Sequence, residues 1–166
     1  MNRKPRLNRM LLFVLLMIIP MIISSTLAYA KPMTFTTHMS RELPGVETLG
    51  QGQSIFKVSA DGNSVSFRII VANISDITMA HIHISAAPGG NGPPAVWLYP
   101  ASPPAMLIPG RTQGTLMAGT FTASDFVGPL AGMQISDLIT AIMENRAYVN
   151  VHTSSYPGGE IRGNIK

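Results

Sequence analysis

Three of the four histidines of this 166-residue chain lie in two strand-like segments that could come side by side, and they are the side chains best suited to chemistry. His81 and His83 stand two residues apart in the run AHIHIS, and His152 lies in the run AYVNVHT. Side chains at positions i and i+2 of a strand point to the same face about 7 Å apart. His81 and His83 can therefore both place a ring nitrogen about 2 Å from one metal ion, and His152 supplies a third ligand if its strand lies beside theirs. An all-imidazole site of this kind suits copper or zinc.

A second interpretation of the same histidines stays open from the residues alone. Their rings can hydrogen-bond to Asn150, to Tyr148 or to a loop carbonyl, and so hold two strands in register without any metal. Glu160 and Arg162 lie two apart on one face, which predicts an ion pair or a clamp on the 147–153 strand. A weaker prediction is that the Glu160 carboxylate hydrogen-bonds to one of the ligating histidines and orients its ring without touching the metal. We expect His38 to be a surface residue, and no arrangement of catalytic side chains is identified by spacing.

The first thirty residues have the pattern of an export signal. Four basic residues precede an uncharged apolar run at 10–23, and Ala28-Tyr29-Ala30 forms a small-x-small site. The apolar run has 14 residues, fewer than the roughly 20 that a membrane-spanning helix needs. We predict a signal peptide at 1–30 cut after Ala30, and one secreted or extracytoplasmic domain at 31–166. The alternative is membrane anchoring by an uncleaved segment at 10–29.

The charge balance and the lack of cysteine exclude some kinds of partner and of metal site. The chain has twelve basic and eight acidic residues, and the predicted signal removes four of the basic ones, so eight of each sign remain. A balanced domain of this kind has no basic face for nucleic acid. Without cysteine, neither a disulfide nor a thiolate metal site can form. Because the domain is predicted to be exported, we expect an extracellular protein or cell-envelope partner. The oligomeric state and the glycosylation of the Asn73-Ile74-Ser75 sequon stay open.

The hydrophobic pattern predicts an all-β domain. Eight short alternating runs are separated by turn signals such as Asp61-Gly62, and 73–78 and 100–110 are expected to be loops. Ser136-Asp137 ahead of an apolar stretch predicts one short helix at about 136–144. Many short strands and one helix predict an antiparallel Greek-key β-sandwich, either superoxide-dismutase-like or immunoglobulin-like. The predicted strands are 33–40, 52–60, 65–71, 79–85, 95–99, 114–121, 147–153 and 160–165.

The blocks TFTTHMSRELPGV, AHIH with APGGNGPPAVWL, and YVNVHTSSYPGGEIRG resemble the CHRD domain, over about 33–166. The resemblance implies an extracytoplasmic β-sandwich domain and brings no activity with it. Ser85 stands where the family usually has glycine, and Glu42-Leu43-Pro44-Gly45 replaces the usual Glu-Val-Pro-Pro. The histidine set is also similar, more weakly, to the copper ligands of copper/zinc superoxide dismutase, although a bridging histidine and a disulfide are absent.

Two functions follow from these observations. The first is an extracytoplasmic binding or structural module of the CHRD type. The second is a small copper- or zinc-binding protein with redox activity, centred on His81, His83 and His152.

Overall fold

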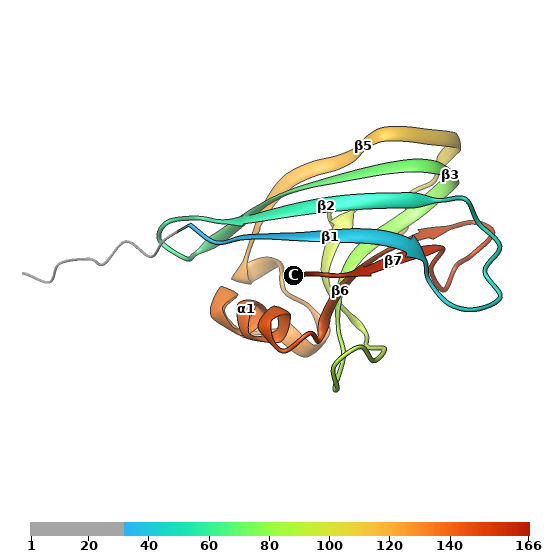
Figure 1. The fold of residues 1–166 in the computed structure, drawn as a ribbon. Helices are drawn as coiled ribbons and strands as arrows, with labels where there is room; N and C mark the ends of the chain where they lie inside the picture. Colours follow the sequence, from blue (N-terminus) through green and yellow to red (C-terminus); the bar gives the residue numbers. More distant parts are fainter. Residues whose placement is uncertain (1–31) are drawn as a thin grey trace, which may run out of the picture.

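The computed structural model describes residues 32–166, so the predicted signal peptide and its cleavage site lie outside the described residues. No helix in this part of the chain is long and apolar enough to cross a membrane. Seven strands, two 3₁₀ turns and one α-helix follow one another along the chain (Figure 1). In order they are β1 Thr34–Arg41, β2 Gln51–Val58, β3 Ser64–Ile84, β4 Pro94–Tyr99, β5 Ile108–Thr122, η1 Ala123–Asp125, η2 Gly128–Leu130, α1 Ile135–Met143, β6 Ala147–Thr153 and β7 Ile161–Asn164.

The strands form one antiparallel sheet that closes on itself. Its hydrogen-bonded order runs β2-β1-β7-β6-β3, and β3 pairs again with β2, which makes a five-stranded barrel. β4 and β5 pair with β3 outside this ring. The prediction of an antiparallel all-β fold is confirmed, but a Greek-key sandwich of two separate sheets is wrong. Closure gives each of the five ring strands a paired neighbour on both sides, and β3 also pairs with β4 and β5.

Closure depends on the unusual length of β3. Its first half pairs with β2 and β5, and its second half pairs with β6 and β4. The loop predicted at 73–78 is wrong, because the strand runs through it with two irregularities, at Asn73 (φ 57°) and Asp76 (φ 53°). Asn and Asp tolerate this left-handed conformation better than other side chains do. The strand therefore bends here without ending, and one strand serves two sets of neighbours.

The barrel interior is apolar and is closed at one end by α1. Alternate residues of β1 and β2, such as Phe35, Met39 and Phe56, are buried, as the period of a half-buried strand requires. Leu138 and Ile142 of α1 face the same small internal void as Phe35 and Phe56. The helix spans 135–143, which confirms the predicted short helix, and its first turn is capped where the Asp137 carboxylate accepts the Gln134 N–H at 2.8 Å. The histidines lie on the opposite, outward face of the sheet.

Candidate metal centre

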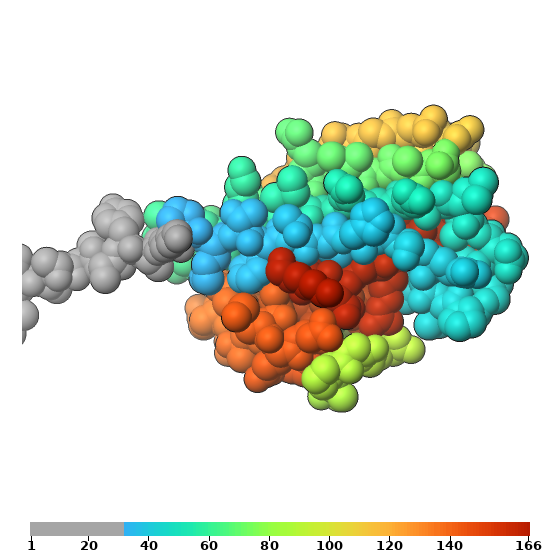
Figure 2. Space-filling view, in the orientation of Figure 1, coloured from blue at the N-terminus to red at the C-terminus, as the bar shows by residue number. Residues whose placement is uncertain are grey.

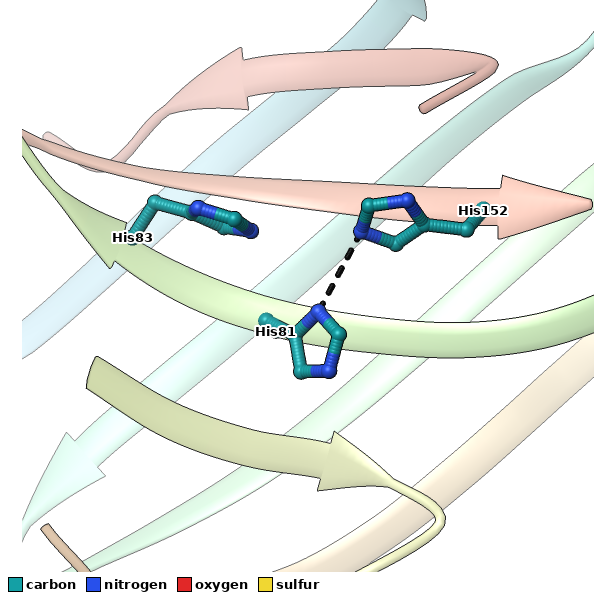
Figure 3. A group of neighbouring side chains, drawn as sticks. All are labelled: His81, His83 and His152. Carbon is teal, nitrogen blue, oxygen red and sulfur yellow. Dashed lines mark hydrogen bonds between the residues drawn. The ribbon is translucent and has the colours of Figure 1, made fainter. Parts of the chain in front are cut away.

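The three predicted ligands lie together on the outer face of the barrel wall. His81 and His83 come from the second half of β3, and His152 comes from the neighbouring strand β6 (Figure 3). In the β3–β6 register His81 pairs with Asn150 and His152 pairs with Met79, so His152 is offset from His81 by two residues and lies on the same face. All three side chains are buried, with 2% of His81 and 6% of His83 and His152 exposed. The predicted convergence of these residues is present in the structure.

The spacing of the ring nitrogens is close to that of a metal site. One nitrogen from each ring lies within 4.8 Å of the others, and His81 Nδ1 lies 3.2 Å from His152 Nε2. Two nitrogens bound to a metal at 2.0–2.1 Å are separated by at most about 4.2 Å. The ring nitrogens therefore need to approach by at most about half an ångström to share one metal ion.

Two of the rings are oriented by backbone carbonyls. His83 Nδ1 donates to the Gly92 oxygen and His152 Nδ1 donates to the Pro157 oxygen, each at 2.8 Å. In a neutral ring, donation from Nδ1 means that the proton is on Nδ1 and that Nε2 carries a lone pair. Since His152 Nε2 is then an acceptor, His81 Nδ1 donates to it. Metal-binding histidines usually donate their second N–H to a carbonyl or carboxylate in this way.

The remaining nitrogens have no protein partner. Nε2 of His81 and Nε2 of His83 are buried, and neither has a hydrogen-bond partner among the described residues. A buried polar atom without a partner costs about 1–3 kcal/mol. The lone pair of His83 lies beside the other two imidazoles, as in a metal site, and a metal held by all three rings would meet His81 at Nδ1, the nitrogen that faces His152, with the His81 proton moved to Nε2 (Figure 3).

Burial keeps the three rings neutral. It lowers the pKa of His81 to about 3, and the proximity of His152 and His83 lowers it further because adjacent positive charges repel. The pKa values of His83 and His152 are also lowered, chiefly by burial, against the opposing effect of their carbonyl partners. Metal binding requires the deprotonated ring, so the site is ready to bind at neutral pH.

Aromatic side chains form the walls of the site. Trp97 of β4 meets the His81 ring edge-on with the ring centroids 4.3 Å apart, and Tyr148 of β6 stacks on His83 at 4.9 Å and 12°. Sequence reasoning named Tyr148 only as a hydrogen-bond partner and did not name Trp97. The pairing of β4 with β3 places Trp97 opposite His81, and that pairing cannot be deduced from the local pattern.

The predicted neighbours of the site have other partners. Glu160 is buried, and its carboxylate accepts hydrogen bonds from Thr48 Oγ1 at 2.5 Å and Thr153 Oγ1 at 2.7 Å. It thus clamps the end of β6, as predicted, but the predicted ion pair with Arg162 is wrong, because Arg162 lies 3.6 Å from Glu42. A second-shell role for Glu160 stays a prediction, with no hydrogen bond to a histidine among the described residues. His38 is exposed on β1, as expected.

Comparison with known proteins places this fold in a family. The family model of the CHRD domain matches residues 34–165. The chain belongs to the CHRD-domain family. Its matched region takes in every strand of the CHRD barrel and all three histidines. No match was found among curated proteins or among solved structures.

Proposed function

We propose that this chain is an extracytoplasmic CHRD-domain module that binds one copper or zinc ion through His81, His83 and His152. The observation that carries the proposal is the set of buried ring nitrogens: His81 Nδ1 and the unpartnered Nε2 of His83 lie beside Nε2 of His152, and two of the three rings are fixed by carbonyls. Copper(II) is expected to bind more tightly than zinc, following the general order of divalent affinities.

The alternative, a purely structural role, accounts for the contacts less well. Histidines that only hold strands in register would use both ring nitrogens in hydrogen bonds, since an unsatisfied buried nitrogen lowers stability. The β3–β6 pairing already fixes the register through seven backbone pairs from Ile77 to Ile84. Export is supported by the basic and apolar pattern of residues 1–30.

A metal titration tests the proposal. Residues 31–166, which contain every described strand and helix, are purified, loaded with copper or zinc, dialysed and analysed for bound metal. Trp97 is the only tryptophan and touches His81, so copper(II) is expected to quench its fluorescence. We expect one equivalent of metal, and an affinity lowered about 100-fold or more in His83→Gln.

The matched control is His38→Gln, which removes the one histidine outside the triad from an exposed position on β1. It should keep the wild-type affinity and stoichiometry. Equal metal retention by His83→Gln and His38→Gln, or none by the wild-type protein, would overturn the metal assignment and leave the domain as a binding or structural module.

A further inference from the structure

Arg162 of β7 holds the loop that joins β3 to β4. Its Nη1 donates to Asn91 Oδ1 at 2.5 Å and its Nη2 donates to the Gly90 carbonyl at 2.6 Å. The central carbon of the guanidinium lies 3.4 Å from the centroid of the Tyr148 ring, which is a cation–π contact. Only 11% of the Arg162 side chain is exposed. The guanidinium is thus fixed both by the loop and by the aromatic ring beneath it.

The same loop, residues 85–93, orients a predicted metal ligand. The Gly92 N–H donates to Tyr148 Oη at 3.2 Å, and the Gly92 carbonyl accepts from Tyr148 Oη at 3.1 Å and from His83 Nδ1 at 2.8 Å. A Cβ at Gly92 would lie 1.9 Å from the Ile84 carbonyl oxygen, so only glycine allows this close approach. The position of the 85–93 loop and the orientation of the His83 ring are therefore coupled.

Arg162 also separates the triad from open solvent. An open cavity of about 470 Å³ is lined by Arg41, Glu42, Asn91, Arg162 and Asn164, together with neighbouring glycines. From this cavity inward, the guanidinium, the Tyr148 ring and the His83 ring stack in succession. The space-filling view shows the yellow-green loop standing out beside the red C-terminal strands (Figure 2). The way from the cavity to His83 thus passes between this loop and β7.

We propose that Arg162 is a latch: it fastens the 85–93 loop over the His83 side of the triad, and copper or zinc enters and leaves when the latch opens. This inference rests on the proposed function for its metal, but the latch itself exists in the metal-free protein. Hydrogen bonds from a charged donor are stronger than neutral ones, so breaking them is the main cost of opening. Weakening them must accelerate both entry and exit.

The first test measures metal exchange in Arg162→Lys, which keeps the charge and loses the forked donor and the stacking plane. Copper association is followed by quenching of Trp97 fluorescence, and dissociation by its recovery after an excess of chelator is added. We expect both rate constants to rise about tenfold or more, the effect of one charged hydrogen bond, with a much smaller change in Kd. The control Arg41→Lys changes an arginine of the same cavity that has no hydrogen bond to the loop among the described residues, and should leave both rates unaltered.

The second test needs no metal. Diethyl pyrocarbonate modifies accessible imidazoles, so the exposed His38 should react rapidly and the three buried histidines slowly, at the rate of opening. Arg162→Lys, and independently Asn91→Ala, should accelerate the slow phase about tenfold while the His38 phase stays constant. Asn91 is exposed, so its truncation removes a loop contact without disturbing the core.

The two tests distinguish failure of the latch from failure of the proposed metal function. If the wild-type protein retains no metal but Arg162→Lys accelerates histidine modification, the latch is present and the proposed metal function fails. If metal binds and only the dissociation rate rises, Arg162 merely stabilises the loaded site and is not a latch. If neither variant alters the slow modification phase, the latch is refuted whatever the metal affinity.

Discussion

The metal-free protein should lose stability on mild acidification, and His81 should be the main cause. Its folded-state pKa is about 3, against about 6.5 for an unperturbed imidazole. Between these values the unfolded chain binds a proton that the folded protein does not, so the free energy of unfolding rises with pH across this window. The stabilisation is therefore fully present above pH 6.5 and is lost as the pH falls toward 3.

The size of the stability loss follows from how far the pH lies below the unfolded-state pKa of His81. At pH 4.5, two units below the unfolded value, the loss attributable to His81 is about 2.7 kcal/mol, at 1.36 kcal/mol per unit. For a domain of this size that corresponds to a fall in Tm of roughly 10 °C. His83 and His152 act in the same direction, since burial lowers both of their pKa values.

Urea unfolding followed by Trp97 fluorescence at pH 7.5 and 4.5, in the presence of a metal chelator, measures this difference. His81→Gln removes the titrating ring and should reduce the difference by at least about 2 kcal/mol. His38→Gln removes an exposed ring and should keep the wild-type difference. If His81→Gln and the wild type lose the same stability between the two pH values, the buried neutral His81 is not responsible, and the electrostatic account of the site fails.

Three further predictions concern the residues around the triad. Tyr148→Phe removes the hydroxyl that holds Gly92 and should weaken metal affinity about tenfold in a competition titration, the size typical of losing an outer-shell contact. Glu160→Gln should lower the free energy of unfolding by about 1–3 kcal/mol, because two threonine hydroxyls lose a charged acceptor, while metal affinity stays constant; a large loss of affinity would instead support the second-shell role. Gly163→Ala places a Cβ 2.1 Å from the His38 carbonyl oxygen and should destabilise the fold by about 3 kcal/mol or more, seen as a lower urea midpoint.

The convergence of the triad could be predicted because it depends on short-range patterns. The spacing of His81 and His83 puts them on one face of any strand, and His152 needs only an adjacent strand in approximate register. What could not be predicted is the set of groups that orient the rings. The carbonyls of Gly92 and Pro157 belong to the backbone, and every residue carries a carbonyl, so no residue type marks them.

The closed barrel was missed for a different physical reason. Asn73, Ser75 and Asp76 have the composition of a loop, and a break there gives two strands of ordinary length, which leads to a sandwich. In the structure these same residues absorb irregularities within one strand. Turn-forming side chains signal an unusual backbone conformation, but they do not distinguish a turn from a bend inside a strand.

This bend also decides which way the histidines face. In the first half of β3 the odd-numbered side chains, such as Val65 and Ile69, are buried in the barrel, and in the second half the even-numbered Ile82 lines the same internal void as Val65. The pairing of β3 with β5 shifts register between Ile69 and Ile70, between Val71 and Ile74, and between Ser75 and Ile77, and its pairing with β6 shifts between Ile77 and Met79. Because side chains alternate with a period of two, the change from odd-numbered to even-numbered buried positions means that the alternation of β3 is interrupted between its two halves. A regular strand would have pointed His81 and His83 into the apolar interior, so the irregularities at 72–79 are what put the imidazoles on the outer face, within reach of His152 and the loops.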